Sequence, residues 1–373
     1  MLRDKYLFRL HWFLRFCLAA GVVSLVWIFV AYFVPQILPE AKVSNRQKSG
    51  IIFRNESWSG EITITGDIWA MPGTRVNIIP GTKISVRRLG DIFNLDWLPW
   101  HLKQGMNTEE EWMGVKNGEF FWDEQNKISL YFAKVYALGM KEQPIIIEAE
   151  NATEETKVEF NVISIKEGIV SFGKLSNYRK MSLGNKVTVR DSRLSNTGEC
   201  SLCADRTSPT IYNNIFESAV RAYITVDGGS PKISNNLFTV SKGKGVIVDP
   251  ERFGAPLIYY NNFEMPGSVA LEFTGGGEEI GGTVILNSFS GGSIIEIPCD
   301  SKVQIAQNSI VGVLRFAHSG NCVGSLILGA NFWQTTDKEA IFREKIVDKE
   351  KRFEVLIPAI LSTPPADIGR LKE

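Results

Sequence analysis

The feature that most constrains the fold is a repeat of about 23 residues between positions 190 and 333. Each copy holds an Asn, one further residue and then a large apolar residue. These Asn residues are Asn214, Asn236, Asn261, Asn287, Asn308 and Asn331, separated by 22, 25, 26, 21 and 23 residues. Ser192 stands 22 residues before the first of them, in the place of an Asn. A unit this short cannot bury a hydrophobic face alone, so it must stack on its neighbours.

The units are typical of β-structure rather than of helices. A short β-rich stretch precedes each Asn, as in PTIYNN at 209–214 and PKISNN at 231–236. Helical repeats need longer units, and the L-x-x-L-x-L core of leucine-rich repeats is missing. Two or three short strands separated by turns fit one unit best, which describes one coil of a parallel β-helix. We expect the Asn residues to form a hydrogen-bonded ladder at one turn, with the neighbouring Phe residues stacked inside.

The P-x-I-x-N-N-x-F words resemble the right-handed parallel β-helix repeat proteins of the pectate-lyase-like superfamily, which include NosD-like repeat domains. Residues 66–85, with a P-G-T-x-I word at 80–84, are similar to the opening coils of such proteins. Residues 331–337 resemble their closing segment, with Gln334 where Gly is usual. The resemblance covers residues 58–362 and implies an all-β solenoid of about ten coils. It implies no single function, because the superfamily holds lyases, hydrolases, epimerases, adhesins and inert scaffolds.

An uncharged run of residues, 16–34, precedes the repeats and is long enough to cross a bilayer as a helix. We expect a cytoplasmic tail at 1–15, a transmembrane helix at 16–38 and a linker at 39–57. The basic residues before the run favour the amino end in the cytoplasm, which places the C-terminal domain of a single-pass protein of the cell membrane outside it. The alternative is a cleaved signal peptide. The run is longer than the usual apolar region of such peptides, and no clean A-x-A site follows it.

Two segments do not fit the repeat. Residues 87–127 form an aromatic-rich insert, in which exposed rings would stack on sugar faces or on a partner protein, or would instead fold over the first coils. Residues 334–362 form a C-terminal cap, where Thr336 to Glu339 predicts a capping box and a helix over 337–347. Residues 363–373 are expected to form a tail. The candidate ligand-binding residues of the insert are Trp97, Trp100, Trp112 and Trp122.

The net charge and the positions of the acidic residues limit which functions are possible. The chain has 41 basic and 41 acidic residues, so it lacks the field that attracts nucleic acid. Asp205, Asp227 and Asp249 are each 22 residues apart and should lie in adjacent coils. They are candidates for a Ca²⁺ site or an acid pair for sugar chemistry, or they are turn residues in open solvent. No G-H-G word or Asp-Asp pair accompanies them, so no catalytic residue, resident metal or cofactor other than Ca²⁺ is predicted.

The cysteines suggest two disulfides. Cys299 and Cys322 each lie nine residues before a ladder Asn, so they should occupy equivalent positions in neighbouring coils. The spacing of coils suits a disulfide between them, with a stacked pair of free thiols as the alternative. Cys200 and Cys203 form a C-x-x-C word without a redox or zinc context, which favours a local loop disulfide.

Three functions remain open from the sequence. The leading expectation is a non-catalytic, membrane-anchored module that binds a polysaccharide or an envelope protein outside the cytoplasm. The first alternative is a polysaccharide lyase or glycoside hydrolase that uses the three Asp residues. The second alternative is a structural assembly component that contacts a partner through the 87–127 insert.

Overall fold

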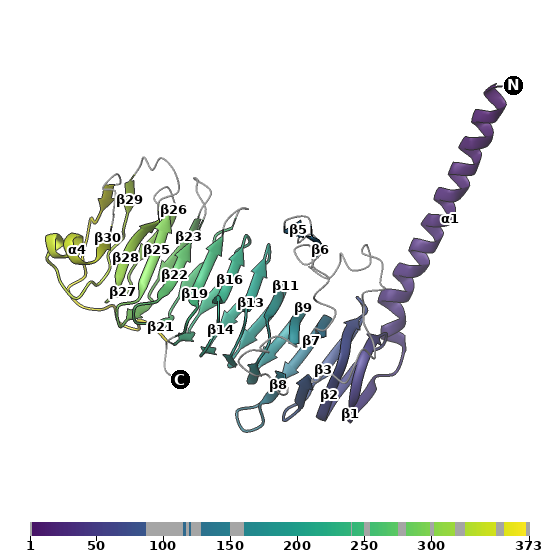
Figure 1. Cartoon of the computed structure of the whole chain (residues 1–373), viewed down its shortest axis with the longest axis horizontal. Coiled ribbons are helices and arrows are strands. Elements are labelled where there is room, and N and C mark those ends of the chain that lie inside the picture. The colour runs from purple at the N-terminus through teal and green to yellow at the C-terminus, as the bar shows by residue number, and fades with distance from the viewer. Residues whose placement is uncertain are drawn as a thin grey trace.

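The computed structural model describes residues 2–86, 115–116, 119–120, 128–149, 160–239, 241–249, 254–274, 281–298, 302–317, 325–347 and 354–370. Its main sheet has 27 strands and coils into an elongated rod (Figure 1). The strands of this sheet pair in parallel from coil to coil. The fold is therefore a parallel β-helix, preceded by an apolar helix and closed by a short C-terminal helix.

The regular coils contribute one strand to each of three rows that run along the rod. The first row contains β1 (Ala41–Ile52), β2 (Glu56–Ala70), β7 (Ile128–Leu138), β9 (Phe160–Ser171), β11 (Lys180–Arg190), β13 (Cys200–Asp205), β16 (Ala222–Asp227), β19 (Lys244–Asp249), β22 (Val269–Phe273), β25 (Ile294–Pro298), β28 (Val313–Ala317) and β30 (Ile346–Val347). Strands β1 and β2 run through all three rows, and the ends of β7, β9 and β11 continue into the second row. That row also contains β3 (Arg75–Ile78), β14 (Thr210–Tyr212), β17 (Lys232–Ser234), β20 (Leu257–Tyr259), β23 (Gly281–Ile285) and β26 (Lys302–Ala306). The third row contains β4 (Lys83–Val86), β8 (Ile145–Ala149), β10 (Gly173–Ser176), β12 (Arg193–Ser195), β15 (Ile215–Phe216), β18 (Leu237–Phe238), β21 (Asn262–Glu264), β24 (Ser288–Ser290) and β27 (Ser309–Ile310).

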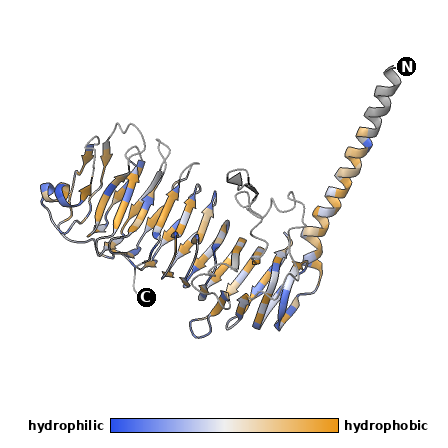
Figure 2. Cartoon of the chain, in the orientation of Figure 1, coloured by the Kyte–Doolittle hydropathy of each residue, from blue (hydrophilic) through white to orange (hydrophobic). Residues whose placement is uncertain are grey.

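Stacked apolar side chains fill the interior of the rod. Residues in equivalent positions of successive coils lie directly above one another, because the register is kept from strand to strand. The clearest stack contains Phe216, Phe238, Phe263 and Phe289, whose neighbouring ring centroids lie 4.8, 4.6 and 4.8 Å apart. All four side chains are fully buried. Apolar residues recur along the strands throughout the rod and along the N-terminal helix (Figure 2).

The N-terminal helix, α1 (Leu2–Ile37), contains a segment long and apolar enough to cross a membrane. This segment is Arg15–Ile37, with a mean hydropathy of 2.4, and little of it is buried in the protein. A signal sequence would meet the same criteria. The predicted linker at 39–57 is wrong for most of its length, because β1 occupies Ala41–Ile52 and pairs with β2. Val43 and Ile52 are buried there and cover the first coil.

The C-terminal end closes the rod with α4 (Lys338–Glu344). Asp337, rather than Thr336, is its N-cap, and its carboxylate accepts hydrogen bonds from the backbone N–H groups of Glu339 and Ala340. Ile341 is fully buried and Ile346 belongs to β30, which pairs with β28. Phe342 stays exposed. A separate parallel pair, β29 (Ser325–Ile327) and β31 (Glu354–Leu356), completes this end.

Residues 363–370 return to the rod instead of leaving it as a tail. The backbone N–H of Arg370 donates to Asn262 Oδ1 at 2.9 Å, and its guanidinium donates to Asn213 Oδ1 at 2.9 Å. The backbone N–H of Gly369 donates to the carbonyl of Leu286 at 2.9 Å. In the 87–127 insert, the described residues form only a short antiparallel pair, β5 (Val115–Lys116) and β6 (Glu119–Phe120).

Candidate functional site

The six repeat asparagines form a buried ladder, which accounts for them structurally. All six are fully buried. Each Oδ1, from Asn236 onward, accepts hydrogen bonds from the backbone N–H and the Nδ2 of the Asn in the preceding coil. Each Nδ2 also donates to a backbone carbonyl of the preceding coil, such as Ile211 for Asn236. Ser192 occupies the ladder position upstream, where its N–H donates to Asn214 Oδ1.

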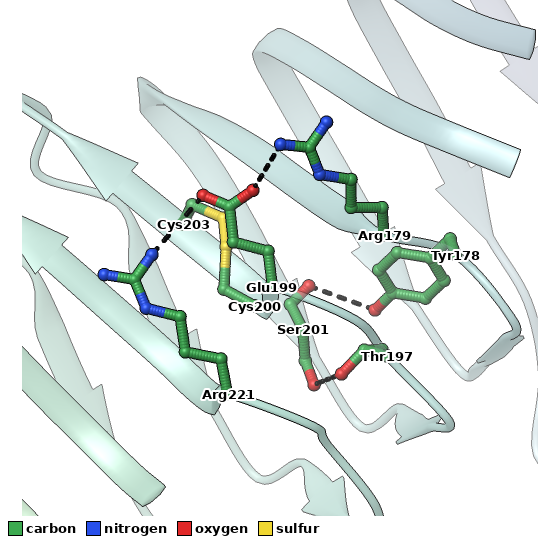
Figure 3. The surroundings of a disulfide bond; sticks show 8 residues. All are labelled: Tyr178, Arg179, Thr197, Glu199, Cys200, Ser201, Cys203 and Arg221. Atoms are coloured by element: carbon green, nitrogen blue, oxygen red, sulfur yellow. Dashed lines mark hydrogen bonds and ion pairs between the residues drawn. A yellow bond between two sulfur atoms is a disulfide. The ribbon is translucent and has the colours of Figure 1, made fainter. Parts of the chain in front are cut away.

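Cys200 and Cys203 are joined by a disulfide that lies within strand β13 rather than in a loop (Figure 3). Opposite them on β11, Lys180 pairs with Cys200 and Ser182 pairs with Cys203. Three residue steps along β13 therefore lie opposite two steps along β11. The disulfide therefore spans a β-bulge, an irregularity that twists a strand and redirects its side chains. Cys200 is buried, whereas Cys203 is partly exposed on the outer face of the sheet.

A shallow trough of about 140 Å³ follows the outer face of the first row across this bulge. Its floor is a row of residues in register, namely Ser182, Cys203, Thr225 and Ile247. One wall is the carboxylate row of Asp205, Asp227 and Asp249, which pair in register at the ends of β13, β16 and β19. The opposite wall holds Lys180, Glu199 and Arg221 at the strand beginnings. The trough thus runs along the rod and crosses strands about 4.8 Å apart.

The two walls of the trough differ in charge. On one wall, Glu199 lies between two guanidinium groups, 3.0 Å from Arg179 and 3.7 Å from Arg221 (Figure 3). On the other wall, the Arg206 guanidinium lies 3.8 Å from Asp205 Oδ1, an atom that is buried and has no hydrogen-bond partner. Among the described residues, no three acidic, His or Cys groups converge closely enough to hold a metal ion.

The interior beneath the trough is rigidly packed. The hydroxyl of Tyr178 donates to the carbonyl of Ser201 at 3.0 Å, and Thr197 and Ser201 share a hydrogen bond of 2.7 Å (Figure 3). Complete burial raises the pKa of Tyr178 well above its ordinary value, because the phenolate would lose its hydration. This phenol is therefore a neutral structural group beneath the trough.

A second, larger groove of about 920 Å³ lies on the same edge of the rod, beside the end of α1. It meets the trough at Asp205, which lines both. Tyr32 and Gln36 of α1 line one side. The charged residues that line the groove are mostly basic, namely Arg75, Lys134, Lys166, Glu167, Lys186, Asp205 and Arg206. We call this the basic groove.

Several residues predicted from the sequence lie outside the described residues. These are Trp97, Trp100, Trp112 and Trp122 of the insert, and both members of the expected Cys299–Cys322 pair. In contrast, the sequence did not predict the basic groove or the wall of the trough that contains Lys180, Glu199 and Arg221. Their residues come from coils of unequal length, and no local motif marks them.

Comparisons with known proteins add no relative. No protein-family model matches the chain, no curated protein matches it, and no solved structure matches it. The likeness to the pectate-lyase-like superfamily is thus supported only at the level of a parallel β-solenoid. The superfamily itself stays a prediction from the repeat words.

Proposed function

We propose that the chain is a membrane-anchored module that binds an extended, hydroxyl-rich polymer, a polysaccharide, without transforming it. The observation that carries this proposal is the trough, whose open length follows the rod. A linear polymer lying in it would meet a new carboxylate at each coil. Ionised carboxylates only accept hydrogen bonds, and sugar hydroxyls readily donate them.

The proposal retains α1 as a single-pass anchor and places the β-helix outside the cytoplasm. The basic residues before the apolar segment support this orientation. The disulfide between Cys200 and Cys203 supports it independently, because disulfides persist in oxidising compartments.

The test is a binding titration of the full chain in nanodiscs against a panel of neutral and acidic polysaccharides, with and without Ca²⁺. We expect saturable binding of at least one neutral polysaccharide, and we expect Asp227→Asn to weaken it by about tenfold. That loss corresponds to about 1.4 kcal/mol, the range of a hydrogen bond to a charged group. The matched control is Asp367→Asn, which alters an exposed acid that does not line the trough. Unchanged affinity in Asp227→Asn would contradict the proposal, because the polymer would then not contact the carboxylate row of the trough.

A second candidate, a glycoside hydrolase or lyase, is favoured by one observation. In-register Asp205 and Asp227 place two carboxylates about one strand spacing apart, close to the separation of about 5 Å in retaining glycosidases. A reducing-end assay on the same panel separates the two functions. New chain ends that are absent with Asp227→Asn would establish an enzyme, and binding without new ends would support the module. The assembly role of the 87–127 insert stays a prediction.

A further inference from the structure

The end of α1 is docked on a corner of the first coils rather than joined to them by a free linker. The backbone N–H of Gly73, between β2 and β3, donates to the carbonyl of Ala31 at 3.0 Å. Ala31 and Pro35 are buried in this contact. A Cβ atom at Gly73 would lie 2.6 Å from the Tyr32 carbonyl oxygen, so only glycine allows the approach. The position of the corner relative to the helix is therefore set by direct contact.

This contact places the basic groove beside the membrane surface. The segment Arg15–Ile37 spans about 35 Å as a helix, against a hydrocarbon core of about 30 Å. Counted from Arg15, Tyr32 lies about 26 Å and Gln36 about 32 Å along the helix, so Gln36 reaches the headgroups at the far boundary of the core and Tyr32 lies about one turn inside it. Both residues line the groove. The rod runs across α1 instead of continuing its direction (Figure 1). Because α1 itself lines the groove, the groove lies beside the end of the membrane segment.

The charges of the groove form a row across the coils. Arg75, Lys134, Glu167 and Lys186 pair in register on β3, β7, β9 and β11. Glu167 is neutralised by Lys134 at 3.1 Å. Lys166 and Lys186 are exposed and form no ion pair with any residue in the described ranges. Arg75 is paired with Glu40 at 3.8 Å and Arg206 with Asp205 at 3.8 Å, so the net positive charge of the groove comes from Lys166 and Lys186.

We infer that the basic groove binds the anionic headgroups of the leaflet from which α1 emerges, and that this contact holds the β-helix flat along the membrane. Basic residues next to a transmembrane helix are attracted by anionic lipid within about one screening length of the surface. The inference rests on the proposed role of α1 as a membrane anchor, and it does not require the trough to bind a polysaccharide.

The first test is amine labelling of the full chain in nanodiscs of phosphatidylcholine, compared with an equal mixture of phosphatidylcholine and phosphatidylglycerol. We expect Lys166 and Lys186 to be labelled at least about fivefold more slowly in the anionic discs. Lys174 and Lys232, exposed on the other rows, are the internal controls and should label equally in both. At 1 M salt, where the screening length falls to about 3 Å, the protection should disappear. Equal labelling of Lys166 and Lys186 in both discs would overturn the inference.

The second test is retention of lipid measured by native mass spectrometry of the full chain. The double variant Lys166→Gln, Lys186→Gln should retain about tenfold less phosphatidylglycerol than the parent, whereas Lys174→Gln, Lys232→Gln should retain the same amount. Equal retention by both double variants would contradict a headgroup site in the groove. Protection of the two lysines by soluble polygalacturonate in neutral discs, without protection by anionic lipid, would make the occupant a soluble polyanion and overturn the membrane contact.

Discussion

At the residue scale, the ladder asparagines hold a turn whose backbone is unfavourable by itself. The residue before the ladder Asn has a positive φ in five coils, at Asn213, Asn235, Tyr260, Leu286 and Gln307, with values of 54–57°. Asn tolerates this left-handed conformation, but Tyr, Leu and Gln adopt it at a cost. The conformation is kept in these coils because the side chain of the next residue satisfies buried backbone groups of the preceding coil and donates to the ladder Asn of the following coil. The ladder thus overrides the local preference of the chain.

Truncating one ladder residue should therefore be severe. Asn261→Ala removes the donor to the carbonyls of Ile233 and Tyr259 and to Asn287 Oδ1, and it removes the acceptor for Asn236. Each buried group left unsatisfied costs about 1–3 kcal/mol, so we expect a loss of at least about 3 kcal/mol in the free energy of unfolding. Denaturant unfolding measures it. Asn77→Ala, which removes one exposed hydrogen bond to Glu40, is the control and should change stability by about 0.5 kcal/mol or less.

At the scale of the elements, close packing between a helix end and a strand corner decides where the anchor sits. Strand β1 covers the first coil, and α1 then meets the corner at Gly73 without an intervening flexible segment. The disulfide in β13 has a comparable local role, because it closes a bulge at the place where the trough begins.

A larger residue at the corner should detach the helix and leave the coils folded. In Gly73→Val the side chain would overlap the carbonyl oxygens of Ala31 and Tyr32. We expect amide hydrogen exchange of residues 31–38 and 71–75 to rise at least about tenfold, with little change in the distal coils. Gly21→Val is the matched control, because no atom lies within 4 Å of the added Cβ. Unchanged exchange at 71–75 would show that the docking contact does not form.

At the scale of the whole molecule, the rod is a one-dimensional stack in which each coil touches only its neighbours. The stability of such a stack depends on its ends, because an uncovered terminal coil exposes its core and an open sheet edge. At the N-terminal end β1 provides this cover. At the C-terminal end Ile341 of α4 and strand β30 do so.

Opening the C-terminal cap should loosen the rod progressively from that end. Ile341→Asp would bury an unpaired carboxylate, which costs several kcal/mol unless the cap detaches. We expect faster hydrogen exchange in β25 and β28 than in the parent, and no change in β7 or β9. The control is Phe342→Asp on the same helix, where the side chain is already exposed. A uniform increase along the whole rod would contradict independent coils.

The sequence by itself determined the repeating part of this protein. The spacing of the ladder asparagines predicted coils of parallel strands, and the uncharged run predicted α1, because stacking and burial repeat the same demand at every coil. Only the tertiary structure decided that β1 is a strand, that residues 363–370 return to the turns, and which polar side chains share the trough and the basic groove. Side chains that point outward are not constrained by core packing, so their residue types need not repeat from coil to coil. Their neighbours are set by register between residues some twenty positions apart, and by the contact that seats α1 against Gly73.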